Sequence, residues 1–270
     1  MPKHQECPRH FELDCYSGCP FDCLYCVERD NWVMPFAARD EVALVARVRE
    51  NREGLPFYLS PKTDAYQPLE EKLGRTRAVL KAAVAAGQPF FVITKSPLVL
   101  RDAALFAGRE AFIAVSLNTL DDELAALTEP GAPPPSARRV LVEELCRMHG
   151  VRCVVKIDPI LPGLTDGPRL EALLAWLAAV KPYAVTAETA RLWRAILARL
   201  EAGLPGELYR SLAAWYPEPG DGPRHPDAAY RMALFRRIEG TLEAAGVRAC
   251  FCRATVPELL NDRDCRGGFA

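Results

Sequence analysis

The chain has 270 residues, of which 50% are apolar and 26% charged, with 17 Gly and 23 Pro. This composition excludes a disordered or fibrous protein, and the length is enough for one barrel or α/β domain with a full core. Because 34 basic side chains stand against 35 acidic ones, the formal net charge is −1, which leaves no electrostatic footprint for non-specific nucleic-acid binding.

The apolar runs of the sequence are short. The longest, at residues 173–180, cannot cross a bilayer, and the first seven residues lack the apolar segment of a secretory signal. We therefore expect a cytoplasmic protein without membrane association. Ten cysteines is a high number for this length, and in a reducing compartment they serve as metal ligands or catalytic thiols more often than as disulfides.

Strand-like and helix-like patterns alternate along most of the chain. The six predicted strands cover residues 10–14, 56–60, 90–94, 111–117, 151–157 and 183–187. The helices predicted to follow them cover residues 39–51, 69–86, 98–106, 136–149, 170–180 and 190–201. Right-handed crossovers between neighbouring parallel strands curl such units into a barrel. The pattern therefore predicts an α/β fold, a partial (β/α)6 TIM-type barrel.

Two proline-rich stretches interrupt this alternation. Residues 129–135 hold four prolines and are predicted to be a loop within one crossover, whereas residues 204–226 hold five and are predicted to connect to a last helix at 227–245. We therefore predict two parts. A barrel with an N-terminal cysteine loop occupies residues 1–203, and a short C-terminal helical extension occupies residues 204–270.

Four cysteines fall within twelve residues directly after the first predicted strand, at Cys15, Cys19, Cys23 and Cys26. Such density indicates a ligand loop. The last three have the spacing Cys-x3-Cys-x2-Cys, which arises by chance in roughly one in a hundred chains with this cysteine content. A structural zinc site usually draws on paired ligands at two separated places, and the sequence holds no second Cys-x2-Cys. A zinc-binding module stays as an alternative.

The spacing of Cys19, Cys23 and Cys26 resembles that of the radical S-adenosylmethionine (SAM) enzymes. The resemblance implies that three thiolates hold a [4Fe–4S] cluster whose fourth iron stays open for the amine and carboxylate of SAM. It also implies that an electron from the reduced cluster breaks the C5′–S bond, and that the 5′-deoxyadenosyl radical abstracts hydrogen from the substrate. An electron donor such as a flavodoxin or ferredoxin would then be a partner. A non-catalytic iron–sulfur electron carrier is the alternative.

Further motifs resemble the spore photoproduct lyase-like branch of this superfamily, although Cys15 stands where that branch has Pro. Most of them follow the carboxyl ends of predicted strands, the rim at which barrel enzymes assemble their sites. In chain order, the motifs lie at residues 16–19, 63–70, 93–96, 116–118, 129–130 and 159–166.

The rim residues have predicted roles toward SAM. Asp64 would receive its ammonium group, with the Thr63 hydroxyl as a further acceptor, although either residue can instead cap a helix. Lys95 would neutralise its carboxylate, and we assign the catalytic role to this lysine and the three thiolates. The aromatic residue before the third cysteine would pack near the adenine. The predicted SAM-contacting residues are Tyr25, Thr63, Asp64, Lys95, Ser116 and Asn118.

Two departures argue against the reaction of the lyase that gives the branch its name. That enzyme uses a hydrogen-donor cysteine shortly before the second-strand Asp, and a Tyr directly after the third cluster cysteine. Here residues 60–64 read SPKTD, and Val27 follows the third cysteine. Since no thiol stands there to return a hydrogen atom, we do not expect repair of the thymine dimer. With no basic patch evident, we favour a small-molecule or peptide substrate. Nucleic-acid repair or modification is the alternative.

A second group of thiols lies near the C-terminus. If residues 247–252 form a strand, Cys250 and Cys252 point to one face and can reach a single metal site. With Cys265, and with Cys15 or Cys7 as the fourth ligand, they would hold a second iron–sulfur cluster. The alternative is that these are buried or surface thiols.

Three charged residues are predicted to face the barrel interior, and two thiols are predicted to be core. Lys156 and Asp158 alternate along the fifth predicted strand, and Glu188 follows the sixth. A charge inside a barrel needs a partner or a substrate, so these are candidate substrate residues. Cys146 and Cys153 have apolar neighbours and are predicted to pack in the core.

Overall fold

The computed structural model describes residues 9–216 and 222–251. Its centre is a seven-stranded parallel sheet whose order in space follows the order in sequence. The strands are β1 (Phe11–Leu13), β2 (Phe57–Leu59), β3 (Phe90–Thr94), β4 (Ala111–Ser116), β5 (Cys153–Ile160), β6 (Ala184–Thr189) and β7 (Ala249–Phe251). Within the described part, β1 pairs with β2 alone and β7 with β6 alone, so the sheet stays open. This confirms the α/β partial barrel.

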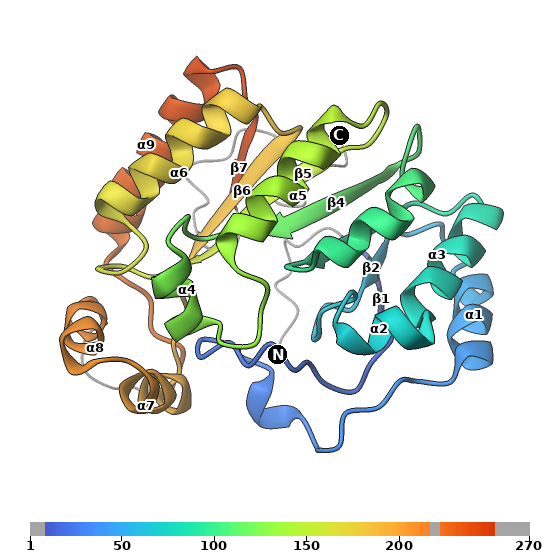
Figure 1. The fold of residues 1–270 in the computed structure, drawn as a ribbon, viewed down its shortest axis with the longest axis horizontal. Helices are drawn as coiled ribbons and strands as arrows, with labels where there is room; N and C mark the ends of the chain where they lie inside the picture. Colours follow the sequence, from blue (N-terminus) through green and yellow to red (C-terminus); the bar gives the residue numbers. More distant parts are fainter. Residues whose placement is uncertain (1–8, 217–221, 252–270) are drawn as a thin grey trace.

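Most helices surround the sheet on its outer side, and α7 and α8 lie apart from it at one end of the molecule (Figure 1). The helices are α1 (Glu41–Glu50), α2 (Pro68–Leu73), α3 (Arg75–Ala85), α4 (Asp122–Thr128), α5 (Pro135–Arg147), α6 (Gly167–Val180), α7 (Arg194–Gly203), α8 (Gly206–Ala213) and α9 (Ala228–Ala244), with 3-10 turns η1 (Arg29–Asn31) and η2 (Pro97–Leu105). Among the described residues, none of these helices combines the length and apolar character that crossing a membrane requires.

Several helices differ from the predicted ones for local reasons. The helix predicted at 69–86 is divided at Gly74, whose φ of +62° ends α2 in the left-handed conformation that glycine adopts without strain. Helix α8 lies inside the predicted proline-rich connector, because Pro205 stands at its start, where the missing N–H costs nothing. Helix α4, before the proline loop, was not predicted from the sequence.

The two faces of the sheet have different cores. On the outer face, Phe57 and Phe90 pack beneath the helices. On the inner face, Tyr58 stacks on Phe91 with ring centroids 4.6 Å apart, and Phe91 stacks on Phe112 at 4.8 Å. Since Phe91 and Phe112 stand near the amino ends of β3 and β4, the rings fill that end of the interior. The cavity therefore lies toward the carboxyl ends of the strands.

The C-terminal part contributes to the same sheet. Strand β7 confirms the strand considered at residues 247–252, and its Cys250 lies in register with Thr186 of β6. Helix α9 packs against both β7 and α6. The division of the chain at residue 203 stays a prediction.

Candidate functional site

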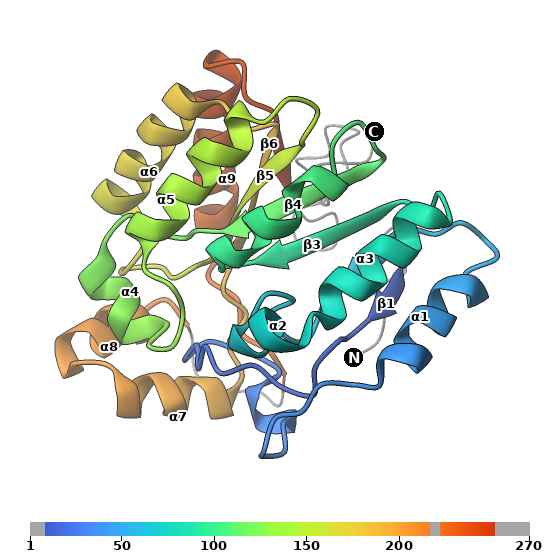
Figure 2. The same cartoon turned by 45° about the vertical axis from the view of Figure 1, so that its right-hand side comes forward.

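The loop that follows β1 carries three thiols to the carboxyl end of the sheet. Figure 2 shows this segment and α7 at the end of the molecule toward which the strand arrows point. A cavity of about 310 Å³ lies there, and Cys19, Cys23 and Cys26 all line it. The side chain of Gln67 holds the start of the loop by donating from Nε2 to the Gly18 carbonyl at 2.8 Å.

The three thiols line one cavity. Within the described residues, no group of three Cys, His, Asp or Glu side chains is placed to share one metal ion. A cubane cluster binds each thiolate on a different iron, so its ligands are spaced more widely than those of a single zinc ion. Three thiols that line one cavity are a donor set that fits a three-thiolate cluster.

Because the thiols are buried, their ionised form needs a positive charge nearby. Desolvation raises the pKa of Cys19 to about 12 and that of Cys23 to about 11. Two buried thiolates in so small a volume would need a compensating positive charge, to which the nearby Lys95 contributes and to which a bound metal would add.

Lys95 lies at the end of β3, facing the cavity. Its Nζ is 4.0 Å from Glu129 Oε1 and 5.8 Å from the centre of the Tyr25 ring. Burial alone would lower the pKa of Lys95, but Cys23 and Glu129 outweigh it and the pKa is raised. The amine is therefore held in its charged form beside the cysteine loop, where it can also meet a ligand carboxylate.

Asp64 joins the ends of β2 and β3. Its Oδ1 accepts from the Thr94 hydroxyl at 2.6 Å and the Tyr66 amide at 2.8 Å, and its Oδ2 accepts from the Lys95 amide at 2.8 Å. A carboxylate offers about four acceptor positions, so one remains for the ammonium group of a ligand. The side chain thus has a structural task, and its position on the cavity wall also suits the predicted binding role.

Buried acceptors without partners mark where a ligand would fit. Among the described residues, Thr63 Oγ1 and Asn118 Oδ1 are buried and accept or donate no hydrogen bond. Thr63 and Ser116 line the cavity, whereas Asn118 does not, and its Nδ2 donates to the Pro159 carbonyl at 3.3 Å. Unsatisfied buried polar atoms are costly, so the Thr63 hydroxyl on the cavity wall fits a polar ligand such as SAM.

Glu129 and Arg138 form a buried ion pair that the sequence did not predict. Arg138 is only 1% exposed, and its guanidinium also donates to the carbonyls of Pro133 at 2.7 Å and Ser116 at 3.1 Å. Lys95 and Arg138 together outweigh burial and hold the pKa of Glu129 below its usual value. The sequence does hold a signal for the burial of Arg138. This arginine lies three residues before Leu141, on the apolar face of α5, where a charged side chain is unusual.

Charged residues of β5 and β6 extend the cavity wall. Lys156 and Asp158 face the same side and form an ion pair of 2.7 Å, and Asp158 and Glu188 both line the cavity. The structure therefore brings Asp158 and Glu188 to the cavity that the thiols line, and Lys156 contacts that wall through Asp158.

The remaining cysteines divide between different environments. Cys250 is buried on the inner face of the sheet, whereas Cys15 packs in the helix-side core, where burial raises its pKa to about 12. The structure does not bring these two thiols together. Cys7, Cys252 and Cys265, the other thiols of the predicted second cluster, lie outside the described residues.

Cys146 and Cys153 lie where their apolar neighbours in the sequence predict. Cys153 is buried in the helix-side core, and Cys146 packs against that core from α5.

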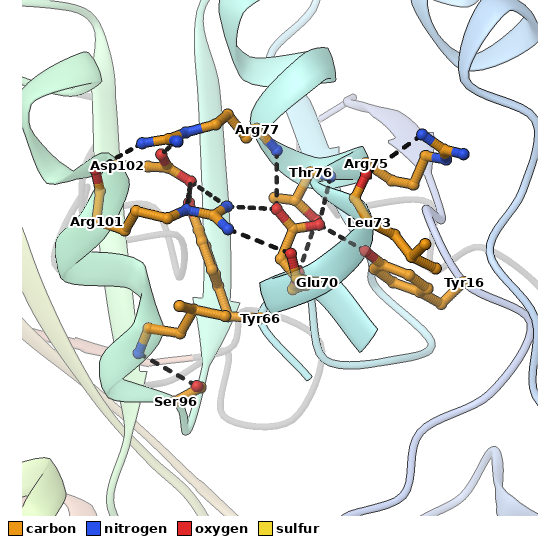
Figure 3. A network of polar contacts seen from close by, with 12 residues as sticks. Tyr16, Tyr66, Glu70, Leu73, Arg75, Thr76, Arg77, Ser96, Arg101 and Asp102 are labelled. Carbon is orange, nitrogen blue, oxygen red and sulfur yellow. Dashed lines mark hydrogen bonds and ion pairs between the residues drawn. The ribbon is translucent and has the colours of Figure 1, made fainter. Parts of the chain in front are cut away.

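A buried polar network supports the approach to the cysteine loop (Figure 3). Glu70 of α2 accepts from the Tyr16 hydroxyl at 2.5 Å, the Thr76 amide at 2.8 Å and Arg101 at 2.5 Å. Because Tyr16 stands three residues before Cys19, this network fixes where the loop starts.

The family model of the radical SAM superfamily matches residues 13–175. The uncharacterized protein Rv2578c of Mycobacterium tuberculosis is 31% identical over 205 residues, covering 69% of this chain and 60% of that protein. The uncharacterized protein MJ0683 of Methanocaldococcus jannaschii is 28% identical over 165 residues, covering 58% of this chain and 62% of that protein. The chain therefore spans about three fifths of the length of the curated relatives it matches.

Solved structures with the same fold are more distant in sequence. A spore photoproduct lyase variant with dinucleoside spore photoproduct superposes with a TM-score of 0.65 at 15% identity, over 88% of this chain and 75% of that one. Streptococcus suis SuiB bound to S-adenosylmethionine superposes with a TM-score of 0.66 at 11% identity, over 94% of this chain and 53% of that one. At such identities the likeness is one of fold.

Proposed function

The chain belongs to the radical SAM superfamily, and from this premise we propose that it is an enzyme that holds a [4Fe–4S] cluster on Cys19, Cys23 and Cys26 and binds SAM beside it. The observation that carries the proposal is that these three free thiols line the same cavity as Thr63, Asp64 and Lys95. A cluster on three thiolates keeps one iron open, and with SAM bound it supplies one-electron cleavage that starts hydrogen abstraction.

The protein's own residues bind and orient. We assign Lys95 to the carboxylate of SAM and Asp64 to its ammonium group, since both line the cavity on neighbouring strands. Thr63, Ser116 and Asn118 would hydrogen-bond the ribose or the carboxylate, and Tyr25 would pack near the adenine. The aromatic rings on the inner face close the amino end of the barrel, which limits water behind the reacting groups.

The substrate would lie against the charged wall formed by Lys156, Asp158 and Glu188. We favour a small molecule or a peptide, and a SuiB structure of the same fold is bound to the precursor peptide SuiA, which supports this choice. We also propose a flavodoxin or ferredoxin as the electron donor, and a reducing cytoplasmic location that keeps the thiols free.

Anaerobic reconstitution tests the proposal. We expect about four irons per chain, and release of 5′-deoxyadenosine when SAM and dithionite are added. Cys23→Ala should lose both, whereas Cys146→Ala, which changes a thiol on α5, should keep both. A wild-type protein that takes up a single zinc ion, or that retains all its iron in Cys23→Ala, would contradict the proposal.

The same iron count tests the second cluster. About eight irons that fall to about four in Cys250→Ala would support it. About four irons in both the wild type and Cys250→Ala would exclude it.

A further inference from the structure

The loop that follows α4 runs beside the cysteine loop and is joined to it by backbone hydrogen bonds. The Leu24 amide donates to the Thr128 carbonyl at 2.9 Å, and the Gly131 amide donates to the Phe21 carbonyl at 3.0 Å. The two bonds fall on either side of Cys23. They therefore fix the backbone between the first and third thiols at two points.

Gly131 lies where the two backbones approach too closely for a side chain. A Cβ at this position would overlap the carbonyl oxygen of Pro20 and would lie 3.0 Å from the backbone of Phe21. Both neighbours are backbone atoms of the segment between Cys19 and Cys23, so making room for a side chain would shift this part of the loop. Glycine is required here for close approach.

Side chains tie the third thiol to the same loop. The Tyr25 hydroxyl donates to Glu129, and Arg138 donates to the other carboxylate oxygen of Glu129. Arg138 in turn donates to the carbonyl of Ser116 at the end of β4. The side chains in this series of contacts are buried, and none of their buried polar atoms lacks a hydrogen-bond partner. A fully satisfied buried network favours a single geometry. The residue before Cys26 is thereby connected to the sheet.

We infer that residues 128–131, with Arg138, brace the cysteine loop, and that Glu129 and Gly131 are positioning residues for the cluster. The inference rests on the proposed function, because it concerns how the three thiols are held for that cluster. A cubane must meet three thiolates at once, so a loop already fixed in that shape loses less conformational freedom on binding. On this inference, the proline-rich stretch that begins at Glu129 and interrupts the crossover serves to hold the cysteine loop in place.

Gly131→Ala tests the brace, with Gly240→Ala as its matched control. Gly240 lies in α9, and a Cβ there meets nothing within 4 Å. In reconstituted protein, we expect Gly131→Ala to lose iron to a ferrous chelator roughly tenfold faster than the wild type, at the lower end of what overpacking a filled site costs. Its reduced cluster should also give an altered electron paramagnetic resonance spectrum. Gly240→Ala should match the wild type in both measurements.

Tyr25→Phe supplies a second test if Gly131→Ala does not fold. It keeps the ring and removes the hydroxyl that donates to Glu129, so iron loss should again be faster than in the wild type. A wild type that takes up no cluster would overturn the proposed function and this role with it. A wild type whose cluster is retained equally well by a folded Gly131→Ala and by Tyr25→Phe, with unchanged spectra, would overturn the brace alone.

Discussion

Glu70 is a buried carboxylate that accepts hydrogen bonds on both of its oxygens. Besides the Tyr16 hydroxyl and Arg101, the backbone amides of Thr76 and Arg77 donate to its two oxygens, at 2.8 and 3.2 Å. The side chain is fully buried. An amide in its place would turn an NH2 group toward these donors and would remove the charge that Arg101 faces. We therefore expect the fold near the cysteine loop to depend more on the charge of Glu70 than on any one hydrogen bond that Glu70 accepts.

We expect Glu70→Gln to lower the free energy of unfolding by about 3 kcal/mol, the lower end for breaking a buried pair, because Arg101 keeps its contact with the neighbouring aspartate. Tyr16→Phe removes one hydrogen bond to a charged acceptor and should cost about 1–2 kcal/mol. Urea unfolding of the cluster-free protein measures both. Equal losses in the two variants would mean that the network does not depend on the charge of Glu70.

Residues that act through a distant partner could not be predicted from the sequence. Spacing alone indicated the three thiols, and position after an apolar strand indicated Asp64 and Lys95, because both signals are local. The contact between Tyr25 and Glu129 joins residues 104 positions apart. The sequence indicates Glu129 only as part of a motif, and no local pattern shows which hydroxyl group donates to which carboxylate.

At the scale of elements, the start of α4 has an electrostatic cap. Asp121 accepts from the Leu124 amide at 3.0 Å and pairs with Arg169 at 2.9 Å. The Leu124 amide and the Arg169 guanidinium hold the pKa of Asp121 below its usual value of 3.8. Since the charged form is favoured in the fold, the stabilisation is present above that value and is lost as the pH falls through the lower pKa of the folded state.

Asp121→Ala should lower the free energy of unfolding by about 0.5–2 kcal/mol at neutral pH, the cost of losing a cap. The difference from the wild type should shrink as the pH falls below about 4. Chemical denaturation at several pH values measures this. Asp121→Asn, which keeps a capping oxygen without the charge, should show a smaller loss and little change of that loss with pH. A difference that grows toward acid pH would mean that the fold does not favour the charged form of Asp121.

The two α-helices that the sequence did not predict, α4 and α8, are short. Apolar runs predicted the six strands and their order, because buried parallel strands carry continuous apolar side chains. Helices α4 and α8 have seven and eight residues, too few for a clear helical period. Gly74 divides the second predicted helix, although the apolar pattern of residues 69–86 continues across this position.

At the scale of the whole molecule, the barrel interior changes character along its axis. Stacked rings occupy the amino end, the Lys156–Asp158 pair lies further along β5, and the cysteine loop covers the carboxyl end. The rings and the ion pair point inward because side chains alternate on parallel strands, whereas the cysteines lie in the loop after β1. A substrate of the proposed enzyme would therefore meet polar and charged groups around the reacting centre, with apolar packing behind them.

Charge balance across the whole chain argues against a nucleic-acid substrate. With 34 basic and 35 acidic side chains, the protein gains little from releasing counterions, which is the main source of non-specific affinity for DNA. We expect the protein to pass through a DNA or RNA column at about 50 mM salt, where phosphate-binding proteins are retained.

Retention that falls steeply with added salt would contradict this expectation. It would point to a local gathering of arginines, such as Arg152 and Arg248, which each lie 5.3 Å from the Tyr183 ring centre, and Arg152→Ala with Arg248→Ala should then abolish the retention.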